Sequence, residues 1–361
     1  MSTRLDSRPP ADAPLVFGRR VVVLRVAGLS ARLHFRVVAV GLAITALLVL
    51  AGLVALGLGD FQVSVPDVVR ALLGQGPQQI QTLIVDWRLS RVVLAVLIGI
   101  ALGISGAVFQ SLTRNPLGSP DVIGFSSGAY TGTLVAMIFI GTSQKSMVAG
   151  GLIGGIATAL AVYLLAYKRG VHGFRLIVVG IAITAMLGSL NVYLLLHTEL
   201  WRAQMAAVWG AGSINGLDWS EVRAMALTLL VVLPFTLGLS RRMDVVEMGD
   251  DAAAALGVHV ERVRLALVVL GVILVAVPTT VAGPITFVAL AAPHLARRLT
   301  RGSGVQLLPS AAMGAALMVV CDLVALHAFA PVIIPAGLVT VVLGGAYLAW
   351  LIAANRRKEL A

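Results

Sequence analysis

The sequence is poor in charged residues, aromatic residues and cysteine. Charged residues make up 12% of the 361 residues, about half of the roughly 25% typical of a soluble domain. Because Cys321 is the only cysteine, an intrachain disulfide bond is excluded. Aromatic residues are at 6%, and alternating segments of about ten residues are missing, which argues against a membrane β-barrel.

Motifs for common catalytic sites are also missing. The chain has no GxxxxGK[ST] phosphate loop, no HExxH and no GxSxG. We therefore expect no enzyme activity, no metal site and no cofactor in this chain, so a partner would have to supply the energy for any active process. The net charge of +11 indicates positive-inside bias rather than nucleic-acid binding, because the chain is so apolar.

What the sequence has in abundance is hydrophobic residues, at 59%. A helix needs about 20 apolar residues to cross the bilayer core of about 30 Å. Charge-free stretches of that order recur along the chain and predict an all-α integral membrane protein in contact with lipid. They are 37–59, 92–113, 122–144, 146–167, 176–198, 224–240, 265–296, 302–321 and 332–355.

One of these stretches is too long for a single span. Residues 265–296 hold 32 residues without a charge, which is about 48 Å of helix at 1.5 Å per residue. We expect a break at Gly283-Pro284, because proline starts a helix but is not tolerated in its interior. Two short helices would result, giving about ten transmembrane helices.

The basic residues support this count. With both termini inside, 21 of the 27 Lys and Arg fall in the inner loops and the termini, as the positive-inside rule requires. We therefore expect a cytoplasmic N-terminal segment at 1–36, a membrane domain at 37–355 and a cytoplasmic tail at 356–361. The polar, Arg-rich start does not read as a signal peptide, so a multi-pass protein of the cytoplasmic membrane is predicted.

Small residues at four-residue spacing predict where helices pack against each other. One predicted span carries Ala95, Gly99, Gly103 and Ala107, and the next carries Gly124, Gly128 and Gly132. Helices in lipid associate by close backbone approach at such residues. We interpret both stripes as helix contact faces, which by themselves say nothing about a substrate.

Residues 247–264, EMGDDAAAALGVHVERVR, predict a short helix on the inner side. Asp250 or Asp251 can cap its N-terminus, the four alanines favour helix, and Gly257 suits a left-handed C-terminal position. Such a short helix is marginal alone. It could lie on the bilayer, but its alanines and two acids suit an anionic leaflet poorly. We favour a docking helix for a cytoplasmic partner.

Asp322 stands out as an acid within a predicted span. A charged side chain in a span costs about 2.5–3.5 kcal/mol on insertion scales and is a candidate for function. The alternative is a helix-to-helix hydrogen bond. A proton-coupled carrier would need several such groups.

Four stretches together resemble the iron-siderophore/cobalamin (FecCD-type) permeases of importing ABC transporters, and within them the ferric enterobactin permeases. These stretches are WRLSRVVLAVLIGIALGISGAVFQSLTRNPLGSPDVIGFSSGA (87–129), EMGDDAAAALGVHVERVR (247–264), AGPITFVALAAPHLARRL (282–299) and IPAGLVTVVLGG (334–345). The resemblance covers nearly the whole chain after residue 37.

The resemblance implies a type II ABC importer permease with ten spans. It implies three kinds of partner: a cytoplasmic ABC ATPase dimer that binds ATP and magnesium, a second and different permease subunit, and an extracytoplasmic siderophore-binding protein. The cargo would be a ferric siderophore of the catecholate type. Haem or cobalamin is the alternative cargo, and a secondary carrier is the alternative from a different class.

The resemblance also assigns roles to individual residues. The coupling helix that seats in the ATPase would comprise Gly249, Asp250, Asp251, Ala252, Ala253, Ala254, Ala255, Leu256 and Gly257. The turn Arg114-Asn115-Pro116 would lie near the same contact, or be a turn only. Arg88 and Arg91 would dock the binding protein, or be arginines that snorkel at a span end.

Three further residues are candidates for the translocation path: Asn191, Tyr193 and Asp322. Many family members carry an arginine soon after the aspartate of this span, whereas this chain has Leu326 and His327. A heterodimer whose partner supplies the arginine would accommodate that loss.

Overall fold

The computed structural model describes residues 21–359 except 27–28, 60, 168–172 and 303. It is helical apart from one short antiparallel hairpin before the first long helix. The elements are β1 (Val21–Val26), β2 (Leu29–His34), α1 (Phe35–Gly57), α2 (Val65–Leu72), α3 (Gln78–Gln81), η1 (Thr82–Leu89), α4 (Ser90–Thr113), α5 (Phe125–Phe139), α6 (Gln144–Ala166), α7 (Gly173–Leu196), α8 (Leu200–Gly210), α9 (Trp219–Gly238), α10 (Ser240–Glu247), α11 (Asp250–Ala255), α12 (Val260–Ala282), α13 (Val288–Thr300), α14 (Leu307–His327) and α15 (Ala336–Glu359).

Each predicted span has a helical counterpart in the structure. Among the described residues, seven helices are long and apolar enough to cross a membrane, and the apolar helices Phe125–Phe139 and Ala336–Trp350 are shorter. Two short helices were predicted from 265–296, but the first of them, α12, is a long helix. α12 has 23 residues, because it begins in the charged stretch before residue 265. α13 has 13 residues, about 20 Å, and does not cross the bilayer alone.

The predicted break at Gly283-Pro284 is confirmed. α12 ends at Ala282, and Gly283 follows with φ +74°, a conformation that favours glycine. A Cβ atom on Gly283 would lie 2.1 Å from the carbonyl oxygen of Trp209. The Ser213 N–H donates to the Ala282 carbonyl at 2.7 Å, so the loop after α8 supplies a hydrogen-bond donor to the last residue of α12.

The two small-residue stripes also lie where the sequence predicts, at helix contacts. Gly99 and Gly103 of α4 lie against the backbone of Gly314 and Ser310 on α14. On the other side of the bundle, Gly132 of α5 lies against Gly150 and Gly154 of α6. In both pairs a Cβ atom on the glycine would fall within 3 Å of the neighbouring backbone, so only glycine permits this spacing.

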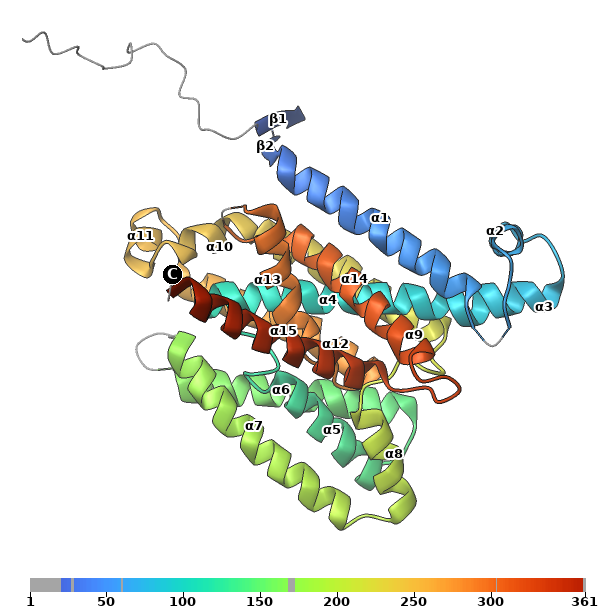
Figure 1. Cartoon of the computed structure of the whole chain (residues 1–361). Coiled ribbons are helices and arrows are strands. Elements are labelled where there is room, and N and C mark those ends of the chain that lie inside the picture. The colour runs from blue at the N-terminus through green and yellow to red at the C-terminus, as the bar shows by residue number, and fades with distance from the viewer. Residues whose placement is uncertain (1–20, 27–28, 60, 168–172, 303, 360–361) are drawn as a thin grey trace, which may run out of the picture.

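The bundle has two ends with different elements. α10, α11 and the end of α15 lie at one end, whereas α2 and α3 lie at the other (Figure 1). α4 runs through the middle between these ends, and most of its side chains are buried. α7 lies at the periphery, with much of its apolar surface exposed. The predicted segment at 1–36 is described only from residue 21, and α15 continues to Glu359, beyond the predicted start of the tail.

Candidate functional site

The short helix predicted at 249–257 is present as α11, with an N-terminus that differs from the prediction. The N-cap residue is Gly249, and within α11 neither Asp250 nor Asp251 caps through its side chain. Both aspartates occupy the first turn, where their charge complements the helix dipole. The prediction that one of them is the cap was wrong, because the Asp250 carboxylate is turned toward two arginines.

The C-terminus of α11 follows the prediction. Gly257 has φ +78°, its N–H donates to the Ala254 carbonyl, and the Val258 N–H donates to the Ala253 carbonyl, both at 2.9 Å. This pair of hydrogen bonds is the Schellman motif, which ends a helix at a left-handed glycine. α11 is therefore stopped after fewer than two turns.

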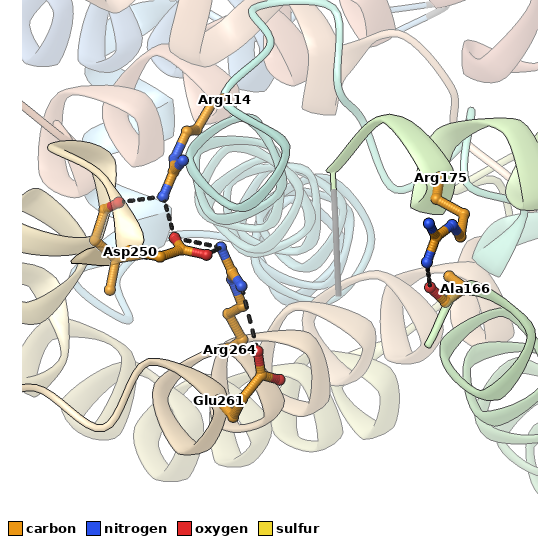
Figure 2. Close-up of polar contacts among 7 residues, drawn as sticks. Arg114, Ala166, Arg175, Asp250, Glu261 and Arg264 are labelled. Carbon is orange, nitrogen blue, oxygen red and sulfur yellow. Dashed lines mark hydrogen bonds and ion pairs between the residues drawn. The ribbon is translucent and has the colours of Figure 1, made fainter. Parts of the chain in front are cut away.

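Asp250 anchors α11 to two long helices (Figure 2). Arg114, at the end of α4, donates to Asp250 Oδ1 at 2.5 Å, and Arg264 of α12 donates to Oδ1 and Oδ2 at 2.7 and 2.9 Å. Partial burial acts to raise the pKa of the Asp250 carboxyl group, but the hydrogen bonds from the two arginines outweigh it and the pKa is lowered. Asp250 is thus charged at neutral pH and held from two sides.

Arg114 is placed by the turn that the sequence predicts at Arg114-Asn115-Pro116. Arg114 ends α4 with φ 49° and also donates to the Val246 carbonyl at 2.7 Å. The Asn115 side chain accepts the Leu117 N–H at 2.9 Å, and the Asn115 carbonyl accepts the Gly118 N–H at 2.9 Å. Asn115 and Pro116 therefore open a tight turn of the expected kind, and this turn aims Arg114 at α11.

α11 has one face against the bundle and one face open. Ala253 is fully buried against its own chain, whereas Ala254, Ala255 and Leu256 are exposed. Met248 and Leu256 flank the helix with 71% and 65% of their surface exposed. The arrangement presents a small apolar surface on a helix with a fixed position, which suits docking of a rigid partner.

At the opposite end of α4, Arg91 forms an ion pair with Asp322. Its guanidinium donates to both carboxylate oxygens at 2.7 Å, and it also donates to Asn215. The side chains of Arg91 and Asp322 are 17% and 7% exposed. The structure thus brings together one residue predicted for docking and one predicted for the translocation path, and joins α4 to α14.

Arg88, the other predicted docking residue, belongs to η1, and its side chain reaches the C-terminal end of α1. Its guanidinium donates to the Leu56 carbonyl at 2.7 Å and to the Phe61 carbonyl at 2.6 Å. Leu56 belongs to the last turn of α1, where a positive charge complements the helix dipole. Arg88 and Arg91 therefore both make contacts within the chain, at the end of the bundle opposite α11.

The two candidates on α7 lie apart from this ion pair. Asn191 is buried, and its Oδ1 has no hydrogen-bond partner among the described residues. Tyr193 is exposed and stacks on His197 of the following loop, with ring centroids 4.2 Å apart. Neither side chain contacts Asp322 in the described structure.

A cavity of about 790 Å³ beside α8 was not predicted from the sequence. Trp201, Met205 and Trp209 of α8 line it, together with Met147 of α6 and Ile333 of the loop before α15. The signal available in the sequence was the pair Trp201 and Trp209, whose spacing of eight places both on one face of a helix. Among the described residues, no group of three or more His, Cys, Asp or Glu could hold a metal ion.

With this geometry in view, the chain can be compared with known proteins. It is 46% identical to the ferric enterobactin transport system permease protein FepG of Escherichia coli (strain K12) over 311 residues, which are 86% of this chain and 94% of that protein. It is 36% identical to the probable siderophore transport system permease protein YfhA of Bacillus subtilis (strain 168), covering 84% of this chain and 91% of the relative.

The fold agrees with these similarities. A solved metal-chelate type ABC transporter in an inward-facing conformation superposes with a TM-score of 0.79 at 28% identity, covering 88% of this chain and 99% of that one. The all-helical arrangement is therefore that of an ABC importer permease. The FecCD transport family matches residues 47–354, and the chain belongs to this family.

Proposed function

We propose that this chain is the membrane-spanning permease subunit of an ATP-driven importer of ferric siderophores. The observation that carries the proposal is α11, which is anchored through Asp250 to α4 and α12 and exposes Met248 and Leu256. A rigid docking helix has a purpose in a transporter driven by a separate ATPase and none in a secondary carrier. ATP and magnesium then bind to that ATPase, and this chain does no chemistry itself.

The similarity to FepG supports a ferric catecholate as the cargo. The path for such a cargo runs between this chain and a second permease subunit, past Asn191 and Tyr193 on the exposed helix α7 and near Asp322. An extracytoplasmic binding protein docks at the outer end, where Arg88 and Arg91 lie. In this proposal α11 and both termini face the cytoplasm.

The coupling step follows from the contacts of Asp250. A movement of α11 by the ATPase is transmitted through Arg114 to α4 and through Arg264 to α12. The turn at Asn115 and Pro116 keeps Arg114 in place during this movement. Because α4 and α12 are mostly buried, they move as rigid elements and change the packing of the spans around them.

Substitutions on the open face of α11 test the proposal. Ala254→Asp with Leu256→Asp would place two carboxylates in the ATPase contact without partners, which is costly, so the ATPase should no longer co-purify. Leu73→Asp, at an exposed site at the end of α2, is the matched control and should retain the ATPase. Equal co-purification of wild type and double variant would refute the assignment of α11. Ala253 is unsuitable for this test, because it faces its own chain.

A further inference from the structure

A second feature of the inner end is a cavity of about 330 Å³ between the end of α9 and the start of α12. Its apolar lining includes Leu239, Val263 and Ala266, and its polar lining is Arg242, His259 and Arg262. The three polar residues are exposed, whereas Val263 is buried. The cavity therefore has an apolar floor and a rim that carries positive charge.

The charge of this rim is not neutralised within the described part of the chain. No carboxylate lies within ion-pair distance of Arg242 or Arg262 among the described residues. The acids nearby are engaged elsewhere: Asp250 and Glu261 pair with Arg264, and Asp244 accepts the Val305 N–H. α12 begins beside the cavity at Val260, and its N-cap residue His259 makes no side-chain cap. The free N–H groups of this helix end add positive potential, which Glu261 in the first turn reduces.

An exposed apolar strip continues from the cavity toward the middle of the bundle. On α9, Phe235 and Val231 lie four and eight residues before Leu239, so they share its face. On α12, Leu265 and Val269 lie three and seven residues after Arg262, so the three residues share one face of the helix. All four side chains are exposed. They belong to helices long and apolar enough to cross a membrane, so this strip lies at the depth of the acyl chains.

We propose that the cavity binds the headgroup of an anionic phospholipid, with the acyl chains along the strip on α9 and α12. Basic pockets at the inner ends of transmembrane helices suit such headgroups. A free phosphate ion would use the rim but would leave the apolar strip without a role. A soluble partner could cover the rim but cannot reach the strip. The lipid satisfies both, and it lies directly behind Gly257, where α11 ends.

Photo-crosslinking in vesicles tests this site with the complete transporter. The probes are phosphatidylglycerol and phosphatidylcholine that carry the same photoreactive acyl chain. We expect phosphatidylglycerol to label the peptides that contain Phe235 or Val269 more strongly than phosphatidylcholine. Arg242→Gln and Arg262→Gln should each reduce this labelling about fivefold, the contribution of one arginine near an anionic surface. Arg241→Gln, which removes the neighbouring arginine outside the cavity, should reduce it less than either cavity variant.

Three results would overturn the proposal. Equal labelling by both lipids in the wild type would show that the site does not select the headgroup. This comparison uses only the wild-type protein, so misfolding of a variant cannot affect it. Loss of labelling in excess inorganic phosphate would assign the rim to a free anion. Loss of ATPase co-purification in Arg242→Gln with Arg262→Gln, with labelling unchanged, would assign the rim to the ATPase contact.

Discussion

Asp250 joins α11 to two long helices at one end of the molecule. Its two ion pairs differ in energy, because the side chains of Arg114 and Asp250 are 40% and 41% exposed, whereas that of Arg264 is 8% exposed. An exposed pair contributes about 0–1 kcal/mol, so Arg114 chiefly sets the direction of α11. Arg264 pairs with Asp250 at 2.7 Å and with Glu261 at 3.3 Å, so loss of the Asp250 charge would leave this buried arginine with only the longer of its two ion pairs.

Asp250→Asn should uncouple ATP hydrolysis from transport. The amide keeps the size of the side chain but loses both ion pairs, so α11 would no longer be held to α4 and α12. The measurement is the ratio of cargo imported to ATP hydrolysed in the reconstituted transporter. Asp251→Asn, at the exposed neighbouring acid, is the control and should behave like the wild type. An unchanged ratio in Asp250→Asn would contradict the anchoring role.

The ion pairs of Asp250 should persist in mild acid. Its pKa in the folded protein is lowered, so their contribution is fully present above the unfolded pKa and is lost only as pH falls through the lower folded pKa. The coupling ratio should therefore show no loss from titration of Asp250 between neutral pH and pH of about 5. Protonation of the Asp250 carboxylate within this range would contradict the direction of the shift.

The ion pair between Arg91 and Asp322 should contribute to the stability of the protein. Breaking a buried pair from one side typically costs about 3–5 kcal/mol, so Arg91→Gln and Asp322→Asn should both lower the melting temperature in detergent. If Arg91 also docks the binding protein, Arg91→Gln should weaken that binding more than Asp322→Asn does. Equal effects of the two variants on binding-protein affinity would leave Arg91 with the structural role alone.

At the scale of elements, α4 and the interrupted pair α12 and α13 connect the two ends. α4 holds Arg91 near its first residue and Arg114 just past its last, and so has an ion pair at both ends. α12 holds Arg264 in its first turns and ends at the Gly283 break. Because the loop after α8 packs into that break, movement of α12 also reaches the cavity beside α8.

A glycine-to-alanine substitution at Gly283 tests the break, and substitutions at Gly257 and Gly345 serve as comparisons. Gly283→Ala adds a Cβ atom 2.1 Å from the Trp209 carbonyl at φ +74°, so it should destabilise most. Gly257→Ala has open space but φ +78°, so it should cost only about 1–2 kcal/mol of backbone strain. Gly345→Ala, in α15 with open space and no positive φ, should be neutral or slightly stabilising. Thermal unfolding in detergent gives the order, and a Gly283→Ala variant as stable as Gly345→Ala would contradict it.

Local patterns in the sequence predicted the spans, the Gly283-Pro284 break, the glycine contact faces and the left-handed end of α11. Each of these follows from residues close together in the chain. The partners of Asp250 and Asp322 could not be predicted in this way. Arg114 and Asp250 are 136 residues apart, and Arg91 and Asp322 are 231 apart, so their pairing depends on how α4 packs against its neighbours. The N-cap of α11 was mispredicted for the same reason, because distant arginines attract Asp250.

For the whole molecule, α7 has an apolar face that no described part of this chain covers. Phe174, Met186 and Leu196 are among its exposed side chains, and lipid or a second permease must cover them. The family resemblance implies an arginine soon after Asp322, whereas this chain has Leu326 and His327 there. In a homodimer, the two-fold axis would repeat this difference on both halves.

We therefore expect this chain to need a different permease as its partner. Expressed with only the ATPase and the binding protein, it should import little or no ferric chelate, and adding the second permease should restore import. Titration of the binding protein onto both assemblies checks whether the partner supplies the missing docking charge. Robust import by this permease alone would contradict the heterodimer and leave the importer assignment intact.

Uptake into proteoliposomes that contain the complete transporter tests the central claim most directly. The assembly combines this chain, the second permease, the ATPase and the binding protein, and the cargo is a ferric catecholate labelled with radioactive iron. Uptake should require ATP, persist without a proton gradient and be lost in Asp250→Asn. Uptake driven by a proton gradient without ATP, and unaffected by Asp250→Asn, would contradict this claim.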